Sequence, residues 1–307
     1  MDAPDPRDVP TYAGLRSFLR APAEVPGDPD VTVFGVPFDI GTTNRPGARF
    51  GPEAVRAASL MLLDDDDPGL RVTPGAGLRI VDRGDLEVVN GYLGASIDLI
   101  EKQVSEIRSH TLAIGGDHTI SLPLLRALRK RHGVPLSLVH FDAHLDTWDD
   151  NFGGPLGHGT PFHHALEEDL IDPASSLQIG IRAPVANALV DANRDRGMTI
   201  LRAEDVHLQG PVAVAERIQN VVGDRPAYLT FDIDGLDPSC APGTGTPVPG
   251  GLFTWQAQAI LSRLADIDWR GMDLVEIAPA YDHAQITALA GAQLAWTYLG
   301  LLTIRAR

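Results

Sequence analysis

Basic residues are scarce in this sequence. Its 307 residues include 25 Lys and Arg against 41 Asp and Glu, which gives a formal net charge of −16. Nucleic acids and anionic membranes are bound through a positive face, so this shortage argues against both as partners. A negative field instead attracts cations. We therefore expect a small cationic ligand rather than a nucleic acid or a membrane surface.

Cysteine and targeting signals are equally scarce. Cys240 is the single cysteine and cannot form an internal disulfide, which favours the cytosol. The first residues, MDAPDPRDVP, are acidic and Pro-rich and lack the apolar core of a signal peptide. The uncharged segment Ala284–Ile304 is as long as a membrane span, but its Gln, Thr and Gly residues favour a helix of the protein core. We expect a soluble, cytoplasmic protein.

The chain also lacks Gly/Ser-rich linkers and internal repeats, so we expect one domain over residues 31–307 behind an N-terminal arm of residues 1–30. Apolar runs of strand length alternate with helical stretches, which is typical of an α/β domain with a parallel sheet. Strands are expected at Val31–Val36, Leu78–Val81, Thr111–Ile114, Leu136–Phe141, Leu177–Ile181, Thr199–Leu201, Ala227–Phe231 and Leu274–Ile277. Helices are expected at Pro52–Leu60, Leu93–Ser109, Ile120–Arg131, Pro161–Glu168, Val185–Asp195, Val212–Val222 and Trp255–Leu264.

Three segments place acids and imidazoles at the ends of apolar strands, where a charge needs compensation. They are GGDH (115–118), HFDAHLD (140–146) and FDIDGLDP (231–238). In an extended chain residues i and i+2 face the same side. Asp142 and His144 therefore share a side, with Asp146 within reach, and Asp232 and Asp234 form a second such pair. Acids gathered in this way would repel one another without cations between them.

The charges balance with two divalent ions. Four carboxylates carry −4 and two ions carry +4, while two imidazoles add neutral nitrogen ligands. The predicted ligands are His118, Asp142, His144, Asp146, Asp232 and Asp234. Oxygen ligands with some imidazole and no thiolate suit Mn²⁺, with Ni²⁺ or Co²⁺ as substitutes. Two ions about 3.5 Å apart can share a water molecule and lower its pKa, which supplies hydroxide at neutral pH.

These segments resemble the motifs of the ureohydrolase family, which includes arginase and agmatinase. The resemblance extends through PFDIGTTNRPGARFGPEAVR, HGTPF and MDLVEIAPAYD, and it is strongest to the agmatinase branch. It implies a three-layer α/β/α domain around an eight-stranded, mostly parallel sheet. It also implies two Mn²⁺ ions, one held by His118 and Asp146 and the other by His144 and Asp234. The remaining two ligands, Asp142 and Asp232, would bridge both ions.

The resemblance further implies hydrolysis of a guanidino group to urea and an amine. Glu276 would receive the substrate guanidinium, whose planar fork matches a carboxylate. His158 would pass a proton to the leaving amine. With Asp234 these two form the predicted catalytic set. His140 is expected to pack within its strand rather than to take part.

Agmatine is the expected substrate, with putrescine and urea as products. The loop after the second motif carries Trp148 and Asn151 among Phe and paired Asp residues, which suits an apolar linker ending in a cation. The alternatives are 4-guanidinobutyrate or another guanidino acid, for which Arg45 would be the partner, a small or alkylated guanidine, and a biguanide.

Two alternatives belong to other classes of protein. One is a non-catalytic subunit that assembles with an active paralogue. The other is a dinucleotide-binding protein, against which the sequence lacks a G-x-G-x-x-G motif after a strand. The family resemblance implies a homotrimer or homohexamer.

Overall fold

A parallel sheet forms the centre of the computed structural model, which describes residues 9–62 and 65–307. Its eight strands lie in the order β2-β1-β3-β8-β7-β4-β5-β6, and all pairings between them are parallel. The strands are β1 Val31–Gly35, β2 Ile80–Asp85, β3 His110–Ile114, β4 Ser137–Phe141, β5 Leu177–Ile181, β6 Thr199–Arg202, β7 Pro226–Asp232 and β8 Asp268–Val275. The predicted α/β fold with an eight-stranded sheet is confirmed.

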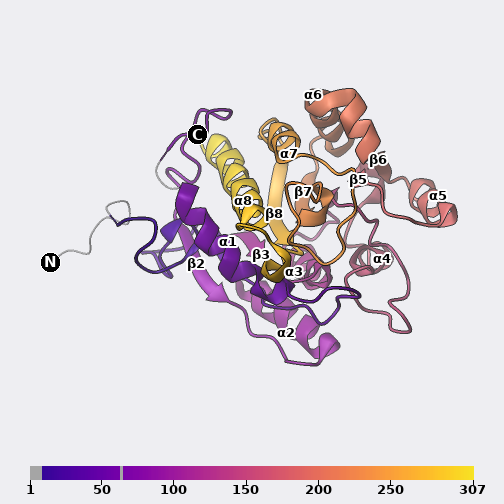
Figure 1. The fold of residues 1–307 in the computed structure, drawn as a ribbon, viewed down its shortest axis with the longest axis horizontal. Helices are drawn as coiled ribbons and strands as arrows, with labels where there is room; N and C mark the ends of the chain where they lie inside the picture. Colours follow the sequence, from indigo (N-terminus) through magenta and orange to yellow (C-terminus); the bar gives the residue numbers. More distant parts are fainter. Residues whose placement is uncertain (1–8, 63–64) are drawn as a thin grey trace.

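Helices cover both faces of this sheet, which completes three layers (Figure 1). Side chains of α1, α6, α7 and α8 form an apolar core with one face, and those of α2, α3 and α4 form a second core with the other. The helices are α1 Gly51–Ser59, α2 Leu93–Glu106, α3 Ser121–His132, α4 Pro161–Glu167, α5 Asn187–Asp195, α6 Ala203–Val222, α7 Thr254–Leu261 and α8 Ile286–Arg305. Coverage on both sides explains why several strands are continuous apolar runs.

Two elements begin six or more residues earlier than the sequence predicts. Strand β8 begins at Asp268 rather than Leu274, because Asp268, Arg270 and Gly271 interrupt the apolar run without ending the strand. Helix α6 begins at Ala203 rather than Val212. It contains a break at Gly210, whose φ of 80° lies in the left-handed region that glycine tolerates, directly before Pro211.

The uncharged C-terminal segment forms a core helix, as expected. Within the described residues, α8 is the one helix long and apolar enough to cross a membrane, and 78% of its most apolar window is buried. Gly291 allows α8 to approach the segment that follows β8 closely, since a Cβ at this position would lie 2.5 Å from Cδ1 of Ile277.

The described part of the N-terminal arm contacts its own domain. Phe18 is fully buried in the core on the α1 side of the sheet, and its backbone N–H donates to Oδ2 of Asp82 at 2.7 Å. The backbone N–H of Leu19 donates to Oγ of Ser59 at the end of α1. Tyr12 and Leu15, by contrast, are 85% and 90% exposed.

Candidate functional site

Four neighbouring strands deliver polar residues to one edge of the sheet. In the order β3-β8-β7-β4, the carboxyl ends of these strands lead directly into the predicted site residues. Asp232 ends β7, Asp142 follows β4, Glu276 follows β8, and His118 lies in the turn after β3. Since parallel strands share one carboxyl edge, residues far apart in sequence meet there.

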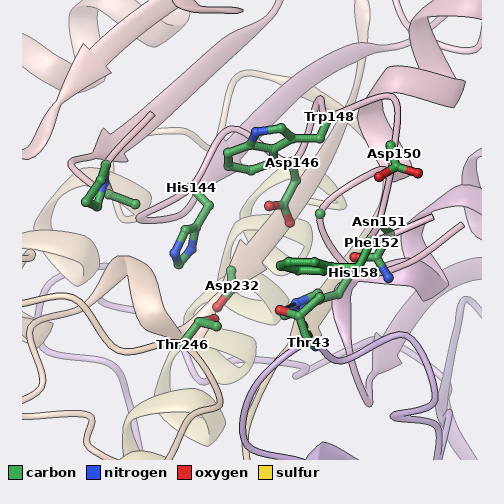
Figure 2. Close-up of a pocket in the computed structure, with 13 residues that line it drawn as sticks. Thr43, His144, Asp146, Trp148, Asp150, Asn151, Phe152, His158, Asp232 and Thr246 are labelled. Carbon is green, nitrogen blue, oxygen red and sulfur yellow. Dashed lines mark hydrogen bonds between the residues drawn. The ribbon is translucent and has the colours of Figure 1, made fainter. Parts of the chain in front are cut away.

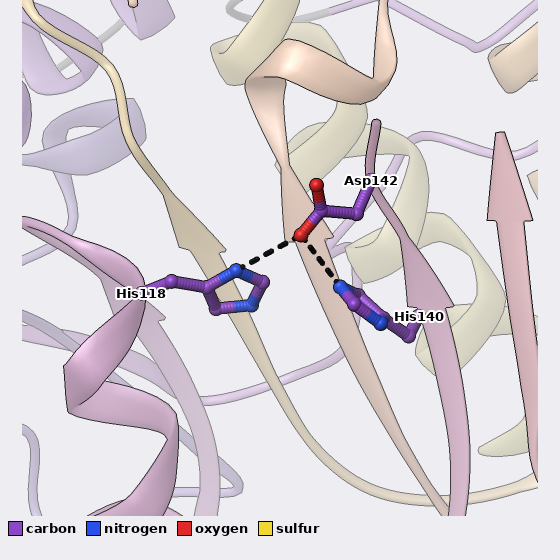
Figure 3. Close-up of side chains that lie close together, drawn as sticks. All are labelled: His118, His140 and Asp142. Carbon is purple, nitrogen blue, oxygen red and sulfur yellow. Dashed lines mark hydrogen bonds and ion pairs between the residues drawn. The ribbon is translucent and has the colours of Figure 1, made fainter. Parts of the chain in front are cut away.

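One cluster gathers around His118. Its Nδ1 atom lies 2.8 Å from Oδ2 of Asp146, 3.1 Å from Oδ2 of Asp142 and 3.2 Å from Oδ2 of Asp232. All four residues are buried, and Nδ1 has no hydrogen-bond partner of acceptable geometry. One imidazole nitrogen cannot satisfy three carboxylates, but a cation between them can contact every one of these atoms. Figure 3 shows the pairing of His118 with Asp142.

A second cluster shares Asp142 with the first. The Nδ1 atom of His144 lies 3.1 Å from Oδ2 of Asp234 and 3.3 Å from Oδ1 of Asp142. The two oxygens of Asp142 thus face different clusters, as a carboxylate that bridges two ions would require. Asp232 groups only with the first cluster, and its Oδ1 atom accepts a hydrogen bond from the backbone N–H of Asp234 at 2.8 Å.

The two clusters are strongly negative. Burial together with the charges of Asp234 and Asp142 raises the pKa of Asp232 well above its usual range. Burial lowers the pKa of His144, but Asp234 and Asp142 outweigh this effect and raise it to about 12. The half-buried Arg182 lies nearby, and its guanidinium donates to backbone carbonyls rather than to these carboxylates. Oxygen and imidazole donors without a thiolate fit two divalent ions of the Mn²⁺, Ni²⁺ or Co²⁺ type.

Glu276 lies beside these clusters, and only one of its two carboxylate oxygens has hydrogen-bond partners. It is 1% exposed, and its φ of 64° places it in the left-handed region, which is strained for a non-glycine residue. Its Oε1 atom accepts from the backbone N–H of His118 at 2.9 Å and lies 3.0 Å from Nδ1 of His158. Its Oε2 atom is buried and has no hydrogen-bond partner.

His158 is oriented from both ring nitrogens. The backbone N–H of Thr43 donates to Nε2 at 3.1 Å, and the Thr43 hydroxyl lies 2.7 Å from the same atom. Because the N–H can only donate, the neutral ring carries its proton on Nδ1 and donates it to Glu276. Burial lowers the pKa of His158, but the carboxylate of Glu276 outweighs burial and raises it to about 9. The N–H of Thr43 therefore stabilises the neutral ring, and the carboxylate of Glu276 stabilises the charged ring.

A cavity of about 390 Å³ opens onto the two clusters. Figure 2 shows His144 and Asp232 on one side of it and Asp150 and Asn151 on the other. The sequence-predicted residues His144, Asp146, Trp148, Asn151, His158 and Asp232 line the cavity. The other predicted residues, His118, Asp142, Asp234 and Glu276, are buried close to these lining residues, in hydrogen-bond or ion-pair contact with them or with one another.

Sequence reasoning missed three participants. Thr43 lies in the loop after β1, and its position after a strand was the available signal. Ala183 and Pro184, which follow β5, also line the cavity. The expectation that His140 only packs within its strand was wrong, because its Nε2 atom lies 2.7 Å from Oδ2 of Asp142.

Comparisons with known proteins agree with this geometry. A model of the arginase family matches residues 29–300. The agmatinase of Chromobacterium violaceum is 45% identical over 95% of this chain and 90% of its own length. The guanidinopropionase of Pseudomonas aeruginosa is 42% identical over 98% of this chain and 96% of its own.

The fold comparison gives the same result. The crystal structure of a hypothetical agmatinase from Burkholderia thailandensis has a TM-score of 0.90 and 45% identity, and the match covers 97% of this chain and 94% of that one. Family match, sequence relatives and fold thus agree over nearly the whole length. The chain belongs to the arginase family and is a metal-dependent ureohydrolase that acts on guanidino groups.

Proposed function

We propose that the protein hydrolyses agmatine to putrescine and urea with two Mn²⁺ ions. His118 and Asp146 would hold one ion, His144 and Asp234 the other, and Asp142 and Asp232 would bridge them. The two clusters support this grouping of the ligands, and the carboxylate that they share, Asp142, supports its place as a bridge. When bound, the ions supply a water molecule of lowered pKa as the nucleophile. Ni²⁺ or Co²⁺ would suit the same donors.

Glu276 is proposed to bind the substrate guanidinium. Its Oε2 atom is buried without a partner, and an unpaired buried carboxylate oxygen needs a hydrogen-bond donor. A guanidinium provides several donors in one plane together with a positive charge. The contacts of Oε1 with His118 and His158 hold the carboxylate in place for this purpose.

His158 is proposed to move the proton that the leaving amine requires. In its charged state the ring can give up a proton, and in its neutral state the N–H of Thr43 stabilises the bare Nε2 atom. The ring lines the cavity and contacts Glu276, so it lies next to the proposed guanidinium position. General acid catalysis needs a group that can visit both states at the reacting atoms.

The charges of the residues that line the cavity are the reason for proposing agmatine as the substrate. Asp150 lines the part of the cavity away from the metal clusters, and none of the described lining residues is Lys or Arg. A guanidino acid would place its carboxylate there without a partner. Arg45 lies over the ring of Tyr281 and is not among the lining residues, and the Arg182 guanidinium donates to carbonyls. The ammonium of agmatine would instead meet the carboxylate of Asp150, in a cavity that the aromatic rings of Trp148 and Phe152 also line.

We further propose that the protein acts in the cytoplasm as a homotrimer or homohexamer in which residues 1–30 contact a neighbouring subunit. The exposed Tyr12 and Leu15 of this arm provide apolar surface for such a contact. Light scattering on the full-length protein measures the assembly, and a monomeric mass would contradict it.

Urea release from Mn²⁺-loaded protein tests the substrate. The panel contains agmatine, arginine, 4-guanidinobutyrate, 3-guanidinopropionate, guanidine and a biguanide. We expect kcat/KM for agmatine to exceed that for both guanidino acids, because only agmatine carries a cation at its far end. A guanidino acid as the best substrate would contradict the reading of Asp150. No release from any compound, with either Mn²⁺ or Ni²⁺, would favour the non-catalytic subunit.

The far end of the substrate is tested by Asp150→Asn. Both oxygens of Asp150 accept from the backbone N–H of Gly153, and an Asn side chain retains one acceptor for it. We expect kcat/KM for agmatine to fall about fivefold, the value of a partly exposed ion pair. In the same variant, turnover of butylguanidine, which has no ammonium, should not change. An Asp149→Asn control should turn over agmatine as wild type does. Equal losses for both substrates would remove Asp150 from recognition.

The metal ligands are tested by Asp232→Ala. Loss of a carboxylate shared by both ions should remove bound metal and activity together, as measured by elemental analysis after dialysis and by urea release. Asp237→Asn is the matched control, because Asp237 accepts only backbone and turn hydrogen bonds in the same segment. Full metal content in the Asp232 variant would refute its place as a bridge.

Glu276 and His158 are distinguished by their kinetic effects. Glu276→Gln should keep its metal and raise KM by roughly 10–100-fold, because a charged hydrogen-bond partner of the substrate is lost. His158→Ala should keep both metal and KM while kcat falls roughly 10²–10⁴-fold, the usual contribution of a general acid. An unchanged KM in the first variant, or a normal kcat in the second, would remove the proposed role.

A further inference from the structure

A row of polar side chains crosses the sheet directly beneath the metal clusters. In strand register His140 of β4 pairs with Gln178 of β5 and with Thr230 of β7, and Thr230 pairs with Asp273 of β8. All four residues are fully buried. Residues paired in register face the same side of a sheet, and residues two apart in one strand do so as well. This polar row therefore lies one step below Asp142 and Asp232, on the same face.

The direction of the hydrogen bonds in this row is determined by its chemistry. One end of the Gln178 amide lies 2.5 Å from the carbonyl oxygen of Leu145. A carbonyl oxygen can only accept, so the atom at this end must be the donor Nε2 and not the oxygen. The same amide nitrogen lies 3.1 Å from Nδ1 of His140. An amide N–H can only donate, so Nδ1 accepts and carries no proton. The ring proton of a neutral His140 must then lie on Nε2, which is 2.7 Å from Oδ2 of Asp142.

We propose that His140 is a positioning residue for the metal centre, held by Gln178 in the tautomer that donates to Asp142. His118, His140 and Asp142 offer ligand-type atoms within 4.8 Å of one another, but the Nε2 atom of His140 has no free electron pair for a metal. Its N–H instead orients the carboxylate of Asp142, through the contact drawn as a dashed line in Figure 3. This inference rests on the proposed two-metal site.

The orientation of Asp142 affects both clusters. Its Oδ2 atom faces the cluster of His118, and its Oδ1 atom faces the cluster of His144. A donor that fixes Oδ2 fixes the direction of Oδ1 as well, so one hydrogen bond aligns the carboxylate for both ions. Partners of this kind typically change metal affinity by roughly 10–100-fold when they are removed.

Thr230 plays the corresponding part for His118. Its hydroxyl oxygen lies 2.8 Å from Nε2 of His118 and can accept the proton of that nitrogen. The ring then presents its Nδ1 atom to the carboxylates. The polar row thus orients one nitrogen ligand and one carboxylate ligand from below, through Thr230 and His140 respectively.

Calorimetric titration of the metal-free full-length protein with Mn²⁺ tests the proposal. Wild type is expected to bind two ions per chain. His140→Phe keeps a ring of similar size but has no donor, and its affinity should be roughly 10–100-fold lower in at least one step. His140→Gln retains an N–H near the position of Nε2 and should bind nearly as wild type does. Gln178→Leu should lose less Mn²⁺ affinity than His140→Phe does, because the imidazole of His140 is still present and can adopt the donating tautomer.

The control separates positioning from general damage to the fold. Ser175→Ala removes another buried hydroxyl near β4, where it bonds to Ser137, and should leave Mn²⁺ affinity unchanged. Wild-type affinity in His140→Phe would overturn the proposal, and so would equal losses in His140→Phe and His140→Gln. If His140→Phe does not fold, wild-type affinity in Gln178→Leu overturns it instead. Wild-type protein that binds no Mn²⁺ would overturn the two-metal site itself.

Discussion

Mutual repulsion among four aspartates determines what the rest of the site must provide. Asp142, Asp146, Asp232 and Asp234 are all at most 6% exposed, and water cannot screen their charges. Backbone N–H groups give partial relief, since His144, Asp234 and Ala143 donate to three of these carboxylates. Arg182, a half-buried cation nearby, donates its hydrogen bonds to carbonyl oxygens of the surrounding loops. Divalent ions between the carboxylates would supply balancing charge, and the fold brings the acids close enough together to hold them.

The sheet topology explains how so many charges reach one place. β3, β8, β7 and β4 are adjacent although they are far apart in sequence, so their carboxyl ends meet at the centre of one edge. Apolar cores pack against both faces of the sheet below this edge. Ligand orientation then depends on the layer below, where His140 and Thr230 hold Asp142 and His118. Metal binding in this fold therefore involves the strands as well as the loops after them.

Much of this arrangement follows from the sequence. The strands are apolar runs, and the i, i+2 spacing of acids at their ends brings Asp142 with His144 and Asp232 with Asp234 onto common sides. Strand order is not encoded in such local patterns, so the meeting of His118 with three aspartates required the family resemblance. The same limit explains the error at His140: its parity with Asp142 was visible, but the Gln178 amide that fixes its proton comes from a neighbouring strand.

Charge at the far end of the cavity depends on individual side chains rather than on the whole chain. The net charge of −16 would favour any cation near the surface, but it places no carboxylate in the cavity. Three arginines occur near the site in sequence or space, and each has another partner: Arg45 lies over the ring of Tyr281, and Arg182 donates to backbone carbonyls. The third, Arg49, pairs with Asp39. With these arginines engaged elsewhere, Asp150 is the charged residue at the far end of the cavity, and its charge supports the proposal of a substrate with a cationic rather than an anionic tail.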